Sequence, residues 1–308
     1  MSGYRRLDVE LPGDDGTTLR GWCFLPDGGG PFAGVVMAHG FSAVKEMALD
    51  RTAAALAGAG FAVLAYDHRN LGASDGEPRQ EIDIWAQTRD YRAAIGWLAA
   101  HRAVDAGRIA IWGSSFSGGE VLVVGALDAR VAAVVAQVPF AGTGGASAGR
   151  SGGSVDPDGS GWQAMREALL TDPPAAAEPA AGPMKVVTDR DGEPAMLAQP
   201  ESWRWFTSEG QRPGSTWRNE CTVRLTCGSL RFDPGLAVAH VAPTPLLMIV
   251  ATEDRLAATD VALAAFERAG EPKELLLVEG DHFVVYDDPT FDRCVRTTIE
   301  FLRRHLGG

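Results

Sequence analysis

The sequence predicts an α/β fold in which a mostly parallel sheet carries helices on both faces. Hydrophobic residues make up 45% of the 308-residue chain and charged residues 22%, which is the composition of a globular protein with a sizeable core. Short apolar runs, rich in β-branched residues or leucine, alternate with segments of helical periodicity. Such runs are typical of parallel strands that are covered on both faces. They lie at residues 34–38, 61–66, 108–112, 131–136, 245–251 and 274–278.

The first 25 residues follow another pattern. Residues 4–11 and 18–25 are predicted to form an antiparallel pair around the turn Gly13-Asp14-Asp15-Gly16. Further on, apolar residues recur on one helical stripe through residues 84–98 and again through residues 291–302. The series of strands and helices therefore predicts a sheet of about eight strands built from βαβ units.

Residues 141–236 break this alternation. A Gly/Ser-rich stretch is followed by an Ala/Pro-rich one, and four of the eight tryptophans lie in the segment: Trp162, Trp203, Trp205 and Trp217. A long irregular segment inside a regular fold is usually a functional lid or a loose surface excursion. Large aromatic side chains are seldom left in water in such numbers, which favours the lid. We therefore predict a cap at 141–236, inserted into a core made of 1–140 and 237–308.

Charge and composition exclude several classes of function. Lys and Arg number 28 against 40 Asp and Glu, so the net charge is −12, which disfavours binding to nucleic acid or to an anionic membrane. The chain has no apolar run near the roughly 18 residues of a membrane span, and its polar N-terminus lacks a signal-peptide pattern. The four cysteines form no CxxC pair and are expected to be buried thiols rather than metal ligands. We predict a cytoplasmic protein that needs no cofactor and no metal.

One motif is typical of nucleophilic catalysis. The sequence Gly113-Ser114-Ser115-Phe116-Ser117-Gly118-Gly119 follows a predicted strand and precedes a helix expected from Glu120. A nucleophile at the tip of such a turn needs strained backbone angles, small neighbours and the free N–H groups of a helix N-terminus. Serine replaces the second glycine of the strict G-x-S-x-G pattern, which is a mild departure. Ser115 is the predicted nucleophile.

A serine hydroxyl needs a base, and the base needs an acid to orient it. Of the six histidines, His282 follows the last predicted strand on a loop before the final helix, where a base should reach over the sheet. Asp254 follows the preceding strand and is the predicted acid, with Glu253 and Asp260 as the alternatives. The order Ser, Asp, His is the one that this elbow architecture requires.

Two backbone N–H groups are expected to stabilise the oxyanion. One belongs to Phe116, directly after the nucleophile. The other is assigned to Phe41 in the loop His39-Gly40-Phe41-Ser42, where Gly40 lets the loop pass close to the site. His39 is expected to be a structural hydrogen bonder.

These motifs resemble the α/β-hydrolase superfamily over nearly the whole chain. The resemblance rests on Met37-Ala38-His39-Gly40-Phe41, the run 66–76, the elbow, Glu253-Asp254 and Gly280-Asp281-His282-Phe283. More narrowly, the chain is similar to the serine hydrolases described as dienelactone-hydrolase-like or peptidase-S15-like, of which some release or trim products in polyketide and nonribosomal peptide pathways. The resemblance implies a sheet of about eight strands, a cap between the sixth and seventh strands, and a Ser–Asp–His triad.

Three hypotheses about function follow. The first is a serine hydrolase that cleaves an ester, thioester or lactone through an acyl-enzyme. The second is an acyltransferase or cyclase that passes the same acyl group to an alcohol or amine. The third is a binding protein or isomerase on a hydrolase fold, since fold alone does not define function. The expected partner is a small-molecule or carrier-bound acyl substrate; a dimer is compatible with the sequence. Trp203, Trp205 and Trp217 are candidates for contact with an apolar acyl group, or for a purely structural cluster.

Overall fold

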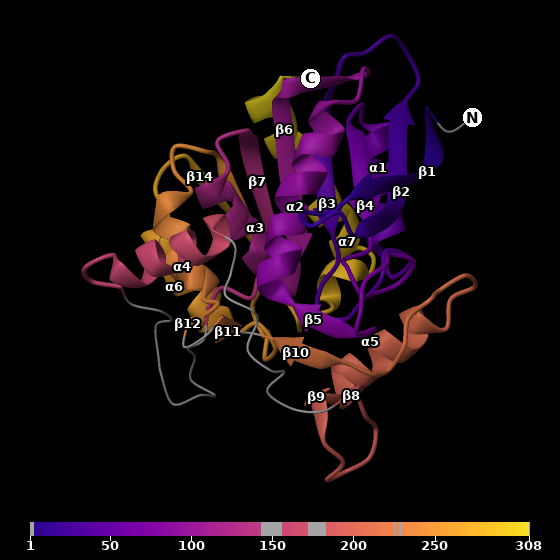
Figure 1. Cartoon of the computed structure of the whole chain (residues 1–308), viewed down its shortest axis with the longest axis vertical. Helices are drawn as coiled ribbons and strands as arrows, with labels where there is room; N and C mark the ends of the chain where they lie inside the picture. The colour runs from indigo at the N-terminus through magenta and orange to yellow at the C-terminus, as the bar shows by residue number, and fades with distance from the viewer. Residues whose placement is uncertain (1–2, 143–155, 172–182, 225, 228–229, 308) are drawn as a thin grey trace.

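An eight-stranded sheet forms the centre of the computed structural model, which describes residues 3–142, 156–171, 183–224, 226–227 and 230–307 (Figure 1). The strand order is β1-β2-β4-β3-β6-β7-β13-β14. Strand β2 runs in the opposite direction to the other seven strands, which are all parallel to one another. The strands are β1 (Tyr4–Pro12), β2 (Thr18–Pro26), β3 (Phe32–Ala38), β4 (Ala62–Tyr66), β6 (Val104–Ser114), β7 (Val131–Gln137), β13 (Leu246–Ala251) and β14 (Lys273–Val278). The predicted α/β class, strand number and α/β-hydrolase fold are confirmed.

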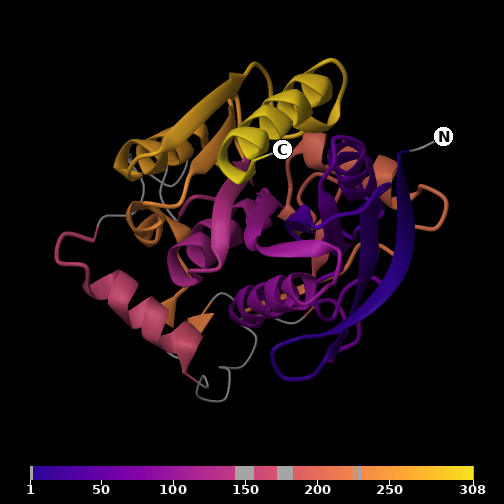
Figure 2. The same ribbon diagram turned by 90° about the horizontal axis from the view of Figure 1, so that it is seen from above.

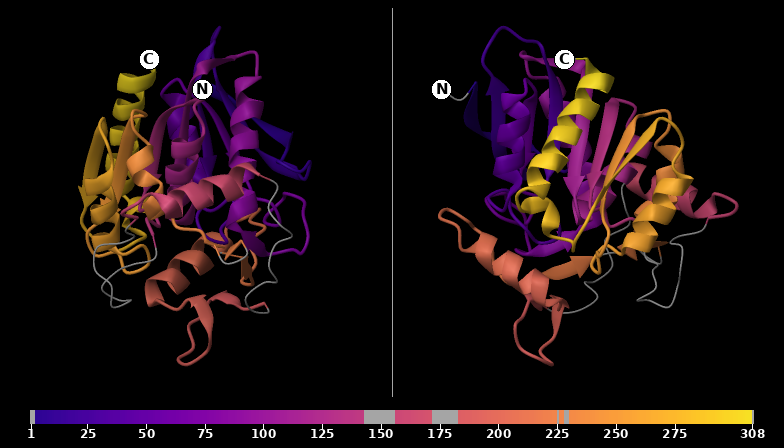
Figure 3. Two further views of the ribbon diagram at one scale, coloured as in Figure 1. Left: turned by 60° about the vertical axis from the view of Figure 1, so that its left-hand side comes forward. Right: turned by 180° about the vertical axis from the view of Figure 1, so that it is seen from behind.

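Helices cover both faces of this sheet (Figure 2). One face packs against α1 (Leu49–Gly58) and α7 (Thr290–Leu306), and the other against α2 (Ile84–Ala99), α3 (Phe116–Leu127) and α6 (Thr259–Arg268). Side chains alternate between the two cores along each strand, as the two-residue period of a strand requires. In β3, for example, Val36 faces the α2–α3 side, whereas Val35 and Met37 face the α1–α7 side. From behind, α7 is seen to cross the sheet (Figure 3).

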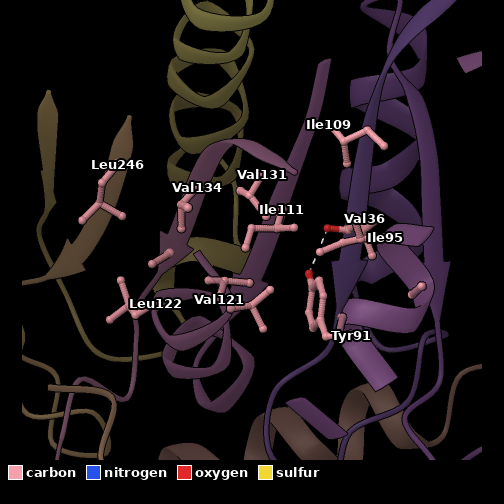
Figure 4. Close-up of a cluster of buried hydrophobic side chains, with 14 of the residues drawn as sticks. Val36, Tyr91, Ile95, Ile109, Ile111, Val121, Leu122, Val131, Val134 and Leu246 are labelled. Atoms are coloured by element: carbon pink, nitrogen blue, oxygen red, sulfur yellow. Dashed lines mark hydrogen bonds between the residues drawn. The ribbon is translucent and has the colours of Figure 1, made fainter. Parts of the chain in front are cut away.

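The core on the α2–α3 side shows why apolar runs form these strands. Ile109, Ile111 and Val134 point from the sheet towards Val121 and Tyr91 of the covering helices (Figure 4). All of them are fully or almost fully buried. Tyr91 keeps its polar end satisfied, because its hydroxyl donates to the Val36 carbonyl oxygen at 2.9 Å. This packing anchors β6, the strand that leads to Ser115.

Between β7 and β13 the chain contributes no described strand to the central sheet. The described parts of this inserted segment (residues 141–236) hold two helices and several short strands, of which α5 and β8–β10 are seen beyond one end of the sheet (Figure 1). Its β10 pairs in parallel with β5 from the first half of the chain. The elements are β5 (Glu81–Asp83), α4 (Ser160–Leu170), β8 (Lys185–Val187), β9 (Ala195–Leu197), α5 (Pro200–Gly210), β10 (Thr222–Arg224), β11 (Thr226–Cys227), β12 (Leu230–Arg231) and η2 (Pro234–Leu236). Most of the Gly/Ser-rich and Ala/Pro-rich stretches lie outside the described residues. The described residues outside this segment also form the 3₁₀ turns η3 (Val238–His240) and η4 (Val284–Tyr286).

Three further expectations from the sequence can be compared with the structure: the start of the helix after the elbow, the state of the cysteines and the absence of a membrane span. The helix after the elbow begins at Phe116 rather than Glu120, because the chain turns into helical geometry directly after Ser115. Cys23, Cys221 and Cys294 are buried free thiols, and burial raises the pKa of Cys221 and Cys294 to about 12. The fourth cysteine, Cys227, has its side chain outside the part of the chain that the structure describes. Among the helices in the described ranges, none combines the length and apolar character of a membrane span; the cytoplasmic location stays a prediction.

Candidate active site

Ser115 sits at a sharp turn between the end of β6 and the start of α3. Its backbone has φ 59° and ψ −115°, and a positive φ in a non-glycine residue is strained. Two backbone hydrogen bonds stabilise this strained conformation. The Ser115 N–H donates to Gln137 O at 2.8 Å, and the Phe140 N–H donates to Ser115 O at 2.8 Å. The turn is a nucleophile elbow in geometry as well as in sequence.

The glycines around Ser115 are required by close packing. A Cβ on Gly113 would overlap the Ser117 carbonyl, and one on Gly118 would lie 2.8 Å from Pro139 Cα. On the other side, a Cβ on Gly40 would come within 3.0 Å of Ser115 Cβ. Small residues thus let the strand, the helix and the Gly40 loop converge on the serine. Ser117 stands at the second glycine position of the motif, and its hydroxyl is accommodated there by hydrogen-bond contacts with Glu120 and His68.

The predicted base and acid are in hydrogen-bond contact with Ser115. His282 Nε2 lies 2.9 Å from Ser115 Oγ, and His282 Nδ1 lies 2.6 Å from Asp254 Oδ2. His282 is 2% exposed and Asp254 6%. With Nδ1 protonated and donating to the carboxylate, Nε2 is free to accept the serine proton, which is the tautomer that a general base needs.

The choice among the three candidate acids is decided by position. Asp254 Oδ1 accepts hydrogen bonds from the backbone N–H groups of Leu256 and Ala257, both at 2.8 Å, which leaves Oδ2 for the histidine. Glu253 and Asp260 are exposed instead. The structure therefore brings together Ser115, His282 and Asp254, and it does not bring the two alternatives to His282.

Phe41 and Phe116 lie on either side of the serine. Their rings meet edge to face, with centroids 5.4 Å apart, and both residues line the cavity that contains Ser115 and His282. In the described part of the chain neither backbone N–H donates to another protein group. Both amides are thus available at the N-terminal end of α3, where the helix dipole favours negative charge.

A cavity of about 450 Å³ opens over Ser115. Its walls are mainly apolar and come from the core loops after β3 and β6, from the His282 loop, and from the inserted segment. The inserted segment contributes Ala141, Gly142, Met196, Leu197, Trp205, Phe206, Val223 and Arg231 to the described lining. A volume and lining of this kind suit a small, largely apolar ligand.

Of the three tryptophans proposed for substrate contact, only Trp205 is among the described lining residues. Its ring stacks on Phe283, with centroids 5.1 Å apart, and lies 4.9 Å from that of Tyr286. Trp203 precedes it by two residues on α5, which turns its side chain by about 200° to another face of the helix. Trp217 packs on Phe206 (5.6 Å) and against Gly210. The positions of Trp203 and Trp217 therefore fit the alternative that they belong to a structural aromatic cluster rather than to the substrate-binding wall.

Comparison with known proteins identifies the family. The family model described as X-Pro dipeptidyl-peptidase (S15 family) matches residues 15–284. A polyketide transferase of Aspergillus fumigatus is 31% identical over 306 residues, which covers 98% of this chain and 99% of that protein. A thiohydrolase of Eupenicillium brefeldianum is 28% identical, covering 89% and 86%. The solved structure of the α/β hydrolase GrgF from Penicillium sp. sh18 has a TM-score of 0.76 at 30% identity, covering 99% of this chain and all of that one.

The chain belongs to the peptidase S15 family. It is therefore an α/β-hydrolase enzyme, of a type that cleaves esters or thioesters or transfers acyl groups, and the hypothesis of a non-enzymatic binding protein is disfavoured. The S15-like resemblance stated from the motifs is confirmed. Identity near 30% over almost the full length of these proteins leaves the substrate of this member to be argued from its own cavity.

Sequence reasoning missed a buried polar network beneath the elbow of this hydrolase. The Ser117 hydroxyl donates to Glu120 Oε2 at 2.5 Å, and His68 Nε2 lies 2.9 Å from Ser117 Oγ and 3.2 Å from Glu120 Oε2. Ser117 and Glu120 have no exposed surface, and His68 is 2% exposed. Buried polar groups are tolerated when they bond to one another. The signal was the serine in place of the second motif glycine, together with the Glu three residues later.

A second missed contact links the elbow to the His282 loop. The Ser114 hydroxyl and the Tyr286 hydroxyl are 2.6 Å apart. Burial raises the pKa of Tyr286 to about 12, so its hydroxyl keeps its proton and serves as a neutral hydrogen-bonding group. The contact ties the residue before the nucleophile to η4, which directly follows His282 and Phe283.

His39 has the structural role that the sequence predicted. Its Nδ1 lies 3.0 Å from Gly40 O and its Nε2 accepts from the His68 N–H at 3.2 Å, so the ring is a neutral bridge between two loops. Complete burial, together with the nearby His68 and Lys45, holds the pKa of His39 well below its usual value. His39 is thus uncharged around neutral pH and helps to fix Gly40 beside Ser115.

Proposed function

We propose that this enzyme takes an apolar acyl group from a thioester or ester onto Ser115 and releases it by hydrolysis. The observation that carries the proposal is the Ser115–His282 hydrogen bond of 2.9 Å at the wall of an apolar cavity of about 450 Å³. The substrate is a small-molecule or carrier-bound acyl group, and the protein needs neither metal nor cofactor for this chemistry.

In the proposed mechanism Ser115 Oγ attacks the carbonyl carbon while His282 Nε2 takes the serine proton. Asp254 holds the imidazole in position and stabilises its positive charge. The tetrahedral oxyanion is held by the backbone N–H groups of Phe41 and Phe116. Collapse expels the thiol or alcohol, which receives the proton from His282. Water then attacks the acyl-enzyme with His282 as base, and the free acid leaves.

The inserted segment acts in this proposal as a cap over 141–236. Support comes from the eight described residues that it contributes to the cavity wall and from the stacking of Trp205 on Phe283, next to the catalytic histidine. Its side chains surround the acyl group, whereas the core supplies the reacting groups. The acyl preference would therefore be decided mainly by the cap.

The cavity suits an acyl group better than the free N-terminus of a peptide. Arg231 is the one permanently charged side chain among the described residues of the lining. Its guanidinium would repel the ammonium group of a peptide N-terminus, which an aminopeptidase site must bind. We therefore infer ester or thioester substrates although the family takes its description from a dipeptidyl-peptidase.

Acyl transfer is the second candidate. It is favoured by the apolar cavity, which limits access of water to the acyl-enzyme, and by the A. fumigatus relative, described as a polyketide transferase. The two outcomes differ only in the nucleophile that attacks the Ser115 ester. Adding an alcohol or amine and measuring ester or amide product against free acid separates them.

The test is intact-protein mass spectrometry after incubation with a fluorophosphonate and with a panel of acyl thioesters and esters. The native chain should gain one fluorophosphonate label, which Ser115→Ala abolishes and Ser114→Ala retains. His282→Ala should slow turnover by on the order of 10³-fold or more while the chain remains folded by circular dichroism. Labelling that persists in Ser115→Ala, or turnover unaffected by His282→Ala, would refute the assignment.

A further inference from the structure

Arg231 differs from every other described residue around the cavity. The remaining lining is apolar or neutral apart from the two histidines, His39 and His282. The Arg231 side chain is also exposed to solvent, so it lies at the rim rather than in the depth of the cavity. A permanent charge at the edge of an apolar cavity is a recognition element when nothing in the protein neutralises it.

No carboxylate in the described part of the chain pairs with Arg231. Two other arginines of the inserted segment show the contrast. Arg212 pairs with Asp50 at 3.2 Å, and Arg224 pairs with Glu81 at 2.6 Å, so each ties the segment to the core. Within the described residues Arg231 forms no such ion pair, and its planar fork of N–H donors is exposed to solvent and open to a ligand.

The backbone holds Arg231 in place. It lies on β12, which pairs with β11, and its neighbours Leu230 and Phe232 pack into an apolar cluster that the inserted segment shares with α2 and the loops around Ser115. Phe232 is 1% exposed and its ring lies 5.4 Å from that of Trp85. Since successive residues of an extended chain point to opposite sides, anchoring Leu230 and Phe232 directs Arg231 to the opposite side of the strand from these two side chains.

The positive charge of Arg231 matters because the rest of the chain and the cavity disfavour anions. The chain as a whole carries a net charge of −12 and therefore repels anions at long range. The apolar interior of the cavity cannot hold an ionised group without a large desolvation cost. An anionic part of a substrate must remain at the rim while its carbonyl reaches Ser115, and Arg231 is the rim residue that attracts it.

We propose that Arg231 is an anion-binding residue that selects substrates with a phosphate or carboxylate outside the apolar cavity. The inference rests on the proposed function, since it concerns the substrate of the Ser115 site. The shared chemistry is a planar or tetrahedral oxyanion facing a guanidinium, which allows paired N–H···O bonds. The anion has two sources in an acyl thioester: a phosphate on the thiol arm, as in coenzyme A, or a carboxylate at the far end of the acyl chain.

Three thioesters of one acyl length distinguish these sources. The first is the coenzyme A thioester, with phosphates on the leaving group; the second is the neutral N-acetylcysteamine thioester; the third is the N-acetylcysteamine thioester with a terminal carboxylate on the acyl chain. We expect Arg231→Gln to lower kcat/KM for at least one anionic substrate about 5- to 10-fold and to change the neutral one less than 2-fold. Arg231→Lys should recover part of the loss.

Salt dependence and a matched variant complete the test. Wild-type kcat/KM for the affected anionic substrate should fall as ionic strength rises, and Arg231→Gln should remove most of that dependence. Arg204→Gln, which removes an exposed arginine of α5 outside the described lining, is the control and should behave as the wild type.

Two outcomes overturn the proposal: equal losses on all three substrates, which would mean a structural role, or no loss on any of them. Both are distinct from failure of the proposed function. In that case the wild type would turn over none of the thioesters and would not be labelled at Ser115 by fluorophosphonate, whatever residue stands at 231.

Discussion

The elbow around Ser115 and the inserted segment above it are built in opposite ways. At the elbow, backbone packs directly on backbone: Gly113 and Gly118 leave no room for a Cβ, and the Ser117 and Glu120 side chains beneath are fully buried. The described inserted segment has strands of only two or three residues and lines the cavity with single side chains such as Met196 and Trp205. Met196 is even 37% exposed. Close packing resists substitution, whereas side-chain walls tolerate it.

This difference in packing indicates that the elbow carries the chemistry and that the inserted segment carries the substrate selectivity. Reacting atoms must be held within a few tenths of an ångström, which the converging backbones of the elbow provide. A binding wall needs only the right shape and polarity. We therefore expect substitutions at the elbow to abolish rate or folding, and substitutions in the inserted segment to change substrate preference.

The largest effect is expected at Asp254. Asp254→Asn should keep the fold but lower kcat/KM on the order of 10³-fold, because the amide no longer holds His282 in the tautomer with a free Nε2. Glu253→Gln and Asp260→Asn, the exposed neighbours, serve as controls and should stay within 3-fold. Thioester kinetics on purified variants measure this; a comparable loss in either control would move the acid elsewhere.

Next comes the packing of the elbow itself. Gly113→Ala places a methyl group on the Ser117 carbonyl and should cost about 3 kcal/mol of unfolding free energy or prevent folding. Gly58→Ala, in α1 with no heavy atom near the added methyl group, should be neutral or stabilising by up to about 1 kcal/mol. Urea unfolding reports both. If Gly113→Ala were as stable as the wild type, the close approach of β6 and α3 would be wrong.

A smaller effect is expected at the cavity wall. Trp205→Ala should raise KM for an apolar acyl thioester about 5- to 10-fold with kcat changed less than 3-fold, because it removes wall area and leaves the reacting groups in place. Trp203→Ala, on the same helix but outside the described lining, is the matched control. A fall in kcat instead would show that the inserted segment also positions His282 through Phe283.

The smallest effect concerns pH. His39 is neutral in the folded protein with a pKa well below its usual value, whereas in the unfolded chain it titrates near 6.5. Below pH 6.5 the unfolded state therefore binds more protons, and stability is lost as the pH falls towards the folded pKa. Between pH 6.5 and 5.5 this amounts to about 1 kcal/mol.

Urea midpoints of the wild type and of His39→Gln at the two pH values measure the His39 contribution. Other groups titrate in both proteins, so the difference between them isolates this residue. The variant should lose less stability than the wild type over that interval; an equal loss would mean that His39 is not buried as a neutral ring.

The residues whose approach to one another the sequence predicts share one property. Ser115, Asp254 and His282 each follow a recognisable strand, and the carboxyl ends of parallel strands meet at one edge of the sheet. Their approach could thus be predicted although 139 residues separate Ser115 from Asp254. The helix start at Phe116 was misjudged because Gly118 and Gly119 suggest a loop, whereas they lie in the first turn of a helix that packs against Pro139 and Phe140.

Other features carry no local signal. Nothing in the pattern around Trp203, Trp205 and Trp217 shows which ring faces the cavity, since that depends on how α5 lies over Phe283 and Tyr286. The network of His68, Ser117 and Glu120 joins the loop after β4 to the first turns of α3, and His68 and Ser117 are 49 residues apart in the chain. The rim position of Arg231 depends on the side chains that bury Leu230 and Phe232.

The amino-acid sequence is thus enough to predict the sheet, the strand ends at which functional side chains lie, and the approach of Ser115, Asp254 and His282 to one another. These follow from short-range periodicity, from glycine at strained turns and from the geometry common to parallel sheets. The shape of the cavity, the direction in which each tryptophan ring points, the polar network beneath the elbow and the exposed Arg231 at the rim could be seen only in the tertiary structure. These depend on contacts between distant segments, where many sequences satisfy the same local pattern and only packing selects one arrangement.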